Sequence, residues 1–171
     1  MKPTRQLHEL GQSLWLDNIT RTLLDDGTLA GYIERFSITG LTSNPTIFQH
    51  ALAEGDAYDA DIASAPSERS TEQLFIDLAL ADLTRAADLF QPVHERTVVM
   101  DGWVSMEISP LLADDARGSV EAAQRIHARA ARGNLFVKIP GTPAGLLAIE
   151  ESTFAGIPIN VTLLFSREQY V

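Results

Sequence analysis

Short apolar runs alternate along the chain with longer stretches in which apolar residues recur every three or four positions. The short runs predict β-strands, and the longer stretches predict amphipathic helices. The strands are expected at residues 14–19, 38–43, 102–109, 134–140 and 157–165. A segment with helical character follows each of them, so strand and helix alternate along the whole sequence. This alternation is typical of a parallel α/β fold.

Polar residues mark where several of these helices begin. Asn44 and Thr142 each precede a proline, which predicts a helix N-cap followed by proline as the first helical residue. Ser70 and Gln73 form the pattern of a capping box at the start of a long amphipathic helix. Gly133 is expected to end the helix that precedes the fourth strand. That helix is predicted to bury one stripe of apolar side chains: Val120, Ala123, Ile126 and Ala130.

Motifs that the sequence lacks narrow the choice among parallel α/β folds. The first strand is not followed by the glycine-rich turn of a dinucleotide-binding domain, and there is no phosphate-loop lysine motif. A (β/α)8 TIM barrel fits the alternation better, although such barrels typically have about 250 residues. The 171 residues supply about the first five βα units of such a barrel. We therefore expect residues 1–171 to form a single partial barrel domain that is truncated at its C-terminal end.

Composition favours a folded, acidic protein and excludes several kinds of site. Apolar residues make up 45% of the sequence and charged residues 21%, which is enough for a packed core. A net charge of −10 without any lysine and arginine cluster argues against nucleic-acid binding. The absence of cysteine excludes disulfides and thiolate sites, and the four histidines lack ligand spacing, so no metal is expected. With no signal peptide and no membrane-spanning stretch in the sequence, we expect a cytoplasmic protein.

Lys138 is the residue that this composition singles out. The sequence contains two lysines, Lys2 and Lys138, and arginine carries the remaining positive charge. Lys138 lies near the end of the apolar run 134–140, where burying an ammonium group is costly. A desolvated lysine can lose its proton and attack a carbonyl to form a Schiff base, which arginine cannot do. The sequence leaves open the alternative that Lys138 reaches solvent or pairs with a carboxylate.

Other expected strands carry polar residues on the same face as Lys138. Side chains alternate between the two faces of a strand, so Phe136 and Lys138 should face the barrel interior. The same alternation directs further polar side chains inward, mostly late in their strands: Asp17, Asn44, Glu107, Asn160 and Thr162. In a barrel, catalysis occurs at that end of the strands. Each of these residues also has a structural alternative, as a helix cap or as the partner of a buried polar group.

Two longer segments resemble signatures of the transaldolase family, which belongs to the Schiff-base-forming class I aldolases. They are residues 40–48 (GLTSNPTIF) and 137–146 (VKIPGTPAGL), and shorter matches follow in the family order at 15–18, 104–110 and 160–166. The resemblance extends nearly from end to end. It implies a barrel enzyme without metal or cofactor, which moves a dihydroxyacetone unit from a ketose phosphate to an aldose phosphate. The donors would be sedoheptulose 7-phosphate and fructose 6-phosphate, in the non-oxidative pentose phosphate pathway.

The resemblance also implies a role for each candidate residue. Lys138 would form the Schiff base, and Asp17 would take the proton from a sugar hydroxyl and so start cleavage of the carbon–carbon bond. Glu107 would shuttle protons through a water held by Thr162 while the carbinolamine dehydrates. The remaining implied residues hold donor hydroxyls or lie at the rim of the site: Asn44, Asn160 and Ser166.

Two alternatives stand beside this interpretation. One is a Schiff-base aldolase that cleaves fructose 6-phosphate without an acceptor, and the other is an inactive partial barrel with a binding or assembly role. Family members continue through further strands that carry the arginine for the substrate phosphate. We therefore expect weak or absent transfer by this chain alone. We also expect it to form a homo-oligomer or to need a complementing C-terminal barrel segment, with sugar phosphates as its small-molecule partners.

Overall fold

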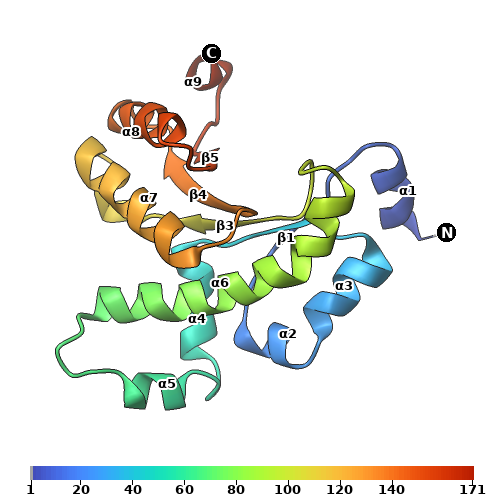
Figure 1. Ribbon diagram of the computed structural model, residues 1–171, viewed down its shortest axis with the longest axis horizontal. Coiled ribbons are helices and arrows are strands. Elements are labelled where there is room, and N and C mark those ends of the chain that lie inside the picture. Colours follow the sequence, from blue (N-terminus) through green and yellow to red (C-terminus); the bar gives the residue numbers. More distant parts are fainter. Residues whose placement is uncertain (1) are drawn as a thin grey trace. The chain divides into compact units, whose positions relative to one another are not determined.

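A computed structural model describes residues 2–171, and the chain divides into two compact units, residues 1–104 and 105–171. Figure 1 shows the elements in chain order. The elements up to the end of the third strand are α1 (Pro3–Glu9), β1 (Trp15–Asp17), α2 (Arg21–Asp25), α3 (Thr28–Phe36), β2 (Gly40–Thr42), α4 (Pro45–Ala53), α5 (Asp59–Ser64), α6 (Thr71–Arg96) and β3 (Trp103–Glu107). The following elements are the 3-10 helix η1 (Pro110–Leu112), α7 (Ala116–Ala130), β4 (Leu135–Pro140), α8 (Pro143–Phe154), β5 (Ile159–Thr162) and α9 (Arg167–Tyr170).

The strands follow one another in the sheet in chain order, β1-β2-β3-β4-β5. β1 pairs with β2 in parallel, and β4 pairs with β5 in parallel. The strand order and the parallel pairs are those of consecutive βα units, in which each crossover helix returns the chain to the same end of the sheet. The predicted α/β fold, with the first five units of a (β/α)8 barrel, is confirmed.

The helix starts follow the local rules that predicted them. Asn44 Oδ1 accepts a hydrogen bond from the N–H of Ile47 at 3.0 Å, and α4 begins at the following proline. Ser70 and Gln73 make both bonds of the capping box at the start of α6. These caps satisfy backbone donors that have no partner within the helix.

Several boundaries differ from those expected. α7 ends at Ala130 rather than at Gly133, because Ala131 adopts the left-handed conformation (φ 47°) and closes the helix with its N–H on the carbonyl of His127. β5 begins at Ile159 rather than at residue 157. It ends at Thr162 rather than at residue 165, because Leu163 is also left-handed (φ 65°) and turns the chain away from the ladder. The lead-in before β1 contains α1, which the sequence pattern did not predict.

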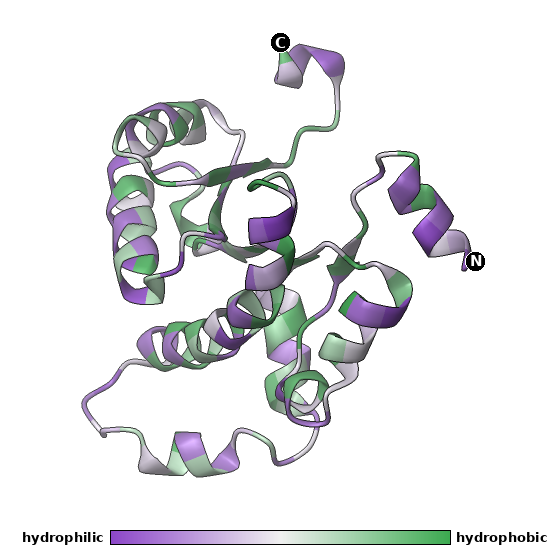
Figure 2. Cartoon of the chain, turned by 45° about the vertical axis from the view of Figure 1, so that its right-hand side comes forward, coloured by the Kyte–Doolittle hydropathy of each residue, from purple (hydrophilic) through white to green (hydrophobic). Residues whose placement is uncertain are grey.

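Each unit has its own buried apolar side chains. In the first unit, α6 presents a fully buried face that includes Leu83 and Phe90. In the second unit, Leu135, Val137 and Ile139 of β4 are fully buried, and the predicted apolar stripe of α7 is buried as well. Figure 2 shows hydrophobic colouring concentrated on the strands, whereas the helices carry both hydrophobic and hydrophilic residues. Among residues 2–171, no helix is both long and apolar enough to cross a lipid bilayer.

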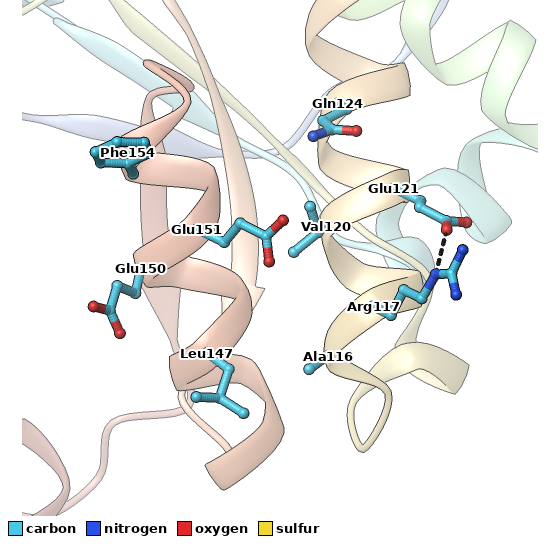
Figure 3. A pocket seen from close by; sticks show the side chains of 9 residues that line it. All are labelled: Ala116, Arg117, Val120, Glu121, Gln124, Leu147, Glu150, Glu151 and Phe154. Carbon is cyan, nitrogen blue, oxygen red and sulfur yellow. Dashed lines mark hydrogen bonds and ion pairs between the residues drawn. The ribbon is translucent and has the colours of Figure 1, made fainter.

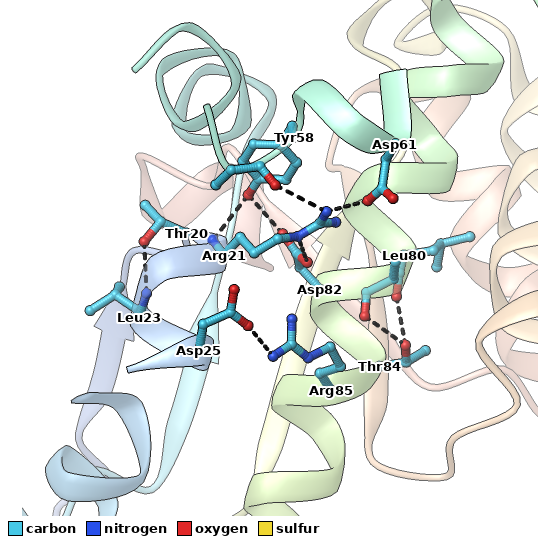
Figure 4. Close-up of polar contacts among 12 residues, drawn as sticks. Thr20, Arg21, Leu23, Asp25, Tyr58, Asp61, Leu80, Asp82, Thr84 and Arg85 are labelled. Atoms are coloured by element: carbon cyan, nitrogen blue, oxygen red, sulfur yellow. Dashed lines mark hydrogen bonds and ion pairs between the residues drawn. The ribbon is translucent and has the colours of Figure 1, made fainter. Parts of the chain in front are cut away.

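A buried polar cluster fastens α2, α5 and α6 together in the first unit (Figure 4). Tyr58 donates its phenolic hydrogen to Asp82 Oδ2 at 2.7 Å, and Arg21 Nε donates to Asp82 Oδ1 at 3.0 Å. Arg21 also pairs with Asp61. Burial lowers the pKa of the Arg21 guanidinium, but its bonds and charge contacts with Asp61 and Asp82 outweigh this effect and raise the pKa overall. Burial, together with the bond to Asp82, raises the pKa of the Tyr58 phenol.

We predict that the free energy of unfolding falls as the pH rises above about 10. Tyr58 ionises near pH 10 in the unfolded chain but only at higher pH in the folded chain. Below pH 10 both states keep the proton and the stabilisation is complete. Above it the unfolded state deprotonates first, and stability declines by up to about 1.4 kcal/mol per pH unit.

Urea unfolding of the Tyr58→Phe variant at several pH values checks this origin. The variant should show a flatter decline than the wild type, whereas Tyr32→Phe, at a partly exposed ring, should keep the wild-type decline. Equal slopes for wild type and Tyr58→Phe would contradict the assignment.

Candidate active site

Lys138 lies on the face of β4 that the strand alternation predicted. Leu135, Val137 and Ile139 are fully buried, whereas Phe136 and Lys138 between them are partly exposed on the opposite face. The Lys138 side chain is 11% exposed to solvent. A primary amine is therefore held on a rigid strand with limited access to water.

Glu107 is the carboxylate that forms an ion pair with Lys138. Its Oε2 lies 3.2 Å from Lys138 Nζ, and its side chain is 18% exposed. Glu107 is the last residue of β3, and the next N–H in the chain, that of Ile108, donates to the carbonyl of Lys138 at 3.1 Å. The pairing with a carboxylate that the sequence left open is thus present. An amine and a carboxylate at this distance can exchange a proton directly.

Asn160 on β5 is the residue paired with Lys138 in the strand register. Its Nδ2 donates a hydrogen bond to Ser105 Oγ at 3.1 Å, and Ser105 is fully buried. Ser105 was not among the predicted site residues. The available signal was the alternation of β3, which places Ser105 on the same face as Glu107. The second unit therefore brings Lys138, Glu107, Asn160 and Ser105 together on neighbouring strands.

Thr162 and Ser166 follow Asn160 along the chain. Thr162 ends β5 opposite Pro140, and its carbonyl accepts the N–H of Gly141 at 2.8 Å. Ser166 is the N-cap of α9, where its hydroxyl accepts the N–H of Gln169 at 3.3 Å in a capping box. The structure thus gives Ser166 a capping function, and its place at a substrate rim stays a prediction.

Asp17 and Asn44 belong to the first unit. Asp17 is the exposed last residue of β1 and lies opposite Thr42 of β2 in the parallel register. Asn44 follows Thr42 by two residues and caps α4, as predicted. Both side chains therefore lie at the carboxyl end of the β1–β2 pair, which is the catalytic end in parallel α/β proteins.

Small and polar residues shape the turn that follows Lys138. Thr142 Oγ1 accepts the N–H of Gly145 at 2.9 Å and donates to the carbonyl of Ala113 at 2.5 Å. The first turn of α8 lies so close to β4 that a Cβ on Gly145 would be 1.9 Å from the carbonyl oxygen of Pro140. The close spacing of α8 against the strand that carries Lys138 thus depends on the absence of a side chain at position 145.

A separate groove lies between α7 and α8 (Figure 3). Its lining includes Glu121, Glu150 and Glu151 beside apolar side chains such as Leu147, and Arg117 in the same groove pairs with Glu121 at 3.0 Å. A phosphate-bearing ligand would meet three carboxylates here, so this groove is a poor site for a sugar phosphate. Among residues 2–171, no group of three or more histidine, cysteine, aspartate or glutamate side chains is placed to hold a metal ion.

Comparisons of this chain with known proteins all indicate the same family. The family model of transaldolase/fructose-6-phosphate aldolase matches residues 14–171. A transaldolase of Thiobacillus denitrificans is 46% identical over 170 residues, which cover 99% of this chain and 47% of that protein. A transaldolase of Neisseria gonorrhoeae is 46% identical over 162 residues, and one of Thermobifida fusca is 44% identical over 169 residues, covering 94% and 98% of this chain and 46% of each relative. The chain spans about half the length of the curated relatives it matches.

We predict that Gly145→Ala destabilises the chain although alanine is the better helix former. Helix propensity favours alanine by about 1 kcal/mol, but the added methyl group meets backbone at 1.9 Å and forces α8 away from β4. The expected net loss in the free energy of unfolding is about 1–3 kcal/mol, measured by urea unfolding. Gly133→Ala is the matched control, because a Cβ there meets no atom within 4 Å, and it should cause no loss. A Gly145→Ala variant as stable as wild type would show that the close approach does not constrain α8.

Proposed function

The chain belongs to the transaldolase/fructose-6-phosphate aldolase family, and we propose that it forms a Schiff base between Lys138 and a ketose phosphate. The reaction would be the transfer of a dihydroxyacetone unit from fructose 6-phosphate or sedoheptulose 7-phosphate to an aldose phosphate. That reaction belongs to the non-oxidative pentose phosphate pathway. The observation that carries the proposal is the Lys138–Glu107 pair, in which a largely buried amine has a proton acceptor 3.2 Å away.

The first half of the proposed reaction takes place at the amine. Lys138 gives up a proton and its nitrogen attacks the ketose carbonyl carbon, which forms a carbinolamine. Protonation of the carbinolamine hydroxyl then releases water and leaves an iminium. Glu107 is the proposed proton shuttle for these steps, acting through a water held by Thr162. The direct 3.2 Å contact with Nζ supports Glu107 as the proton-transfer partner of the amine.

The second half breaks the carbon–carbon bond. Asp17 is the proposed base that accepts the proton of the hydroxyl on C4, so that the bond between C3 and C4 breaks. The electron pair moves into the iminium and gives an enamine on Lys138, while the aldose phosphate leaves. The proposed anchors for the donor hydroxyls are Asn44 and Asn160, with Ser166 at the rim. The enamine then adds to an acceptor aldehyde and hydrolysis frees the lysine.

A second candidate activity is cleavage of fructose 6-phosphate without an acceptor. The name of the matching family model includes fructose-6-phosphate aldolase, which supports this candidate. Incubation of the donor with and without erythrose 4-phosphate separates the two activities. An aldolase releases free dihydroxyacetone in both incubations, whereas a transaldolase needs the acceptor to turn over.

We predict that borohydride reduction in the presence of fructose 6-phosphate leaves a stable adduct on Lys138. Peptide mass mapping locates the adduct, and a single turnover is enough for it to form. Lys138→Met should remove the adduct, while Lys2→Arg should keep it. An adduct found on Lys2, or none on the wild-type chain, would refute the proposal.

We also predict that the two proposed acid–base residues affect different steps. Asp17→Asn should form and trap the imine at the wild-type rate but lose cleavage, because the amine remains and the base is gone. Glu107→Gln should slow trapping itself, by about a hundred-fold or more, because dehydration of the carbinolamine lacks its proton shuttle. Quenched-flow trapping measures both rates. Full-rate trapping and normal cleavage in both variants would contradict these roles.

A further inference from the structure

The buried cluster of Arg21, Tyr58 and Asp82 has no part in the proposed chemistry, yet it fixes the chain just after Asp17. We propose that Tyr58 and Asp82 are positioning residues for Asp17. They hold the start of α2 in place and, through the short connection 18–20, they limit the positions open to the Asp17 carboxylate. This inference rests on the proposed role of Asp17 as the base for cleavage.

The first residue of α2 is held by both its backbone and its side chain. The backbone N–H of Arg21 donates to Tyr58 Oη at 3.1 Å, and its Nε donates to Asp82 Oδ1 at 3.0 Å. The guanidinium carbon lies 4.4 Å from the centre of the Tyr58 ring, within the range of a cation–π contact. Tyr58 Oη in turn donates to Asp82, so the three side chains close a ring of contacts (Figure 4).

The segment between Asp17 and this ring is short and anchored. Ile19 is fully buried, and Thr20 caps α2 by accepting the N–H of Leu23 at 3.1 Å. On the N-terminal side, β1 pairs with β2, and Asp17 lies opposite Thr42 in this pairing. The backbone that carries Asp17 is thus fixed at both ends, while its carboxylate stays exposed at the end of the strand.

A purely stabilising role does not explain the choice of residues. Asp82 is fully buried, and a buried ion pair often adds no more stability than well-packed apolar side chains of similar size. The buried carboxylate of Asp82 instead restricts orientation. Each of its two oxygens has a defined partner, so α2, α5 and α6 can pack in one arrangement. By contrast, the Arg85–Asp25 pair between α6 and α2 is exposed and joins two side chains.

The two stages of the proposed reaction provide a readout for this role. With fructose 6-phosphate, the first imine on Lys138 carries six carbons. After Asp17 takes the C4 hydroxyl proton and the C3–C4 bond breaks, glyceraldehyde 3-phosphate leaves and the enamine remains. Protonation of the enamine carbon by water gives a three-carbon imine. Borohydride reduces either imine to a secondary amine, so the ratio of six-carbon to three-carbon adduct on the Lys138 peptide measures cleavage.

The test compares this ratio in wild type, Tyr58→Phe and Asp82→Asn after equal times with fructose 6-phosphate and borohydride. Displacement of a reacting group by about 1 Å can slow a reaction by about a hundred-fold, so we expect the ratio to rise at least about ten-fold in both variants. The total adduct should match that of wild type, because Lys138 and Glu107 are unchanged. Asp17→Asn sets the upper limit of the ratio. Arg85→Gln, which removes only the exposed pair, is the control and should keep the wild-type ratio.

The outcomes are distinguishable. If Tyr58→Phe and Asp82→Asn are folded and keep the wild-type ratio of six-carbon to three-carbon adduct, the positioning role is overturned. It is also overturned if the ratio is unchanged and the variants lose total adduct only in proportion to their thermal unfolding. A wild-type chain without any adduct overturns the proposed function, and the positioning role falls with it. If adduct forms and the ratio rises only in the two cluster variants and in Asp17→Asn, both proposals stand.

Discussion

An ammonium group that is only 11% exposed on a β-strand requires an anion in contact, and this requirement constrains the strands around Lys138. Glu107, the last residue of β3, supplies this anion. Next to it, the N–H of Ile108 donates to the carbonyl of Lys138 and so joins β3 to β4. The β4–β5 register then sets Asn160 beside Lys138. Ser105 completes the set from the same face of β3 as Glu107. The ion pair thus joins β3 and β4, and the Asn160–Ser105 hydrogen bond links β5 to β3 beside it.

Helix starts rather than long loops hold the ends of these strands. Asn44 and Thr142 cap helices within a few residues of the strand before them, and Thr20 does the same after β1. Each cap satisfies a backbone donor and fixes the direction in which the chain leaves the sheet. The candidate residues at the strand ends are therefore placed by rigid elements, which is the arrangement that acid–base chemistry requires.

The sequence predicted those features that depend on local rules. The alternation of strands and helices gave the fold class, and the caps at Asn44, Ser70 and Thr142 follow patterns within three residues. The pairing of Lys138 with a carboxylate was one of the open alternatives. By contrast, the end of α7 depends on the left-handed conformation of Ala131, which no residue type at that position signals.

The sequence pattern does not predict contacts between residues that lie far apart in the chain. Asn160 and Ser105 are 55 positions apart, and a serine in an apolar strand gives no sign that it orients an amide. Arg21 is 61 positions from Asp82, and Tyr58 is 24 positions from it. Nothing in the local pattern around Tyr58 links it to the start of α2, because that link exists only after the helices have packed.

The scarcity of lysine has a consequence for the chemistry of the protein surface. Free sugars and sugar phosphates condense slowly with exposed lysines, and the products rearrange into permanent glycation adducts. A guanidinium stays protonated and does not form such imines in the way an amine does. Exposed positive charge is carried here by arginines such as Arg85 and Arg117, and Lys2 is the sole lysine besides Lys138. A chain proposed to work among ketose and aldose phosphates thus exposes few amines to unwanted glycation.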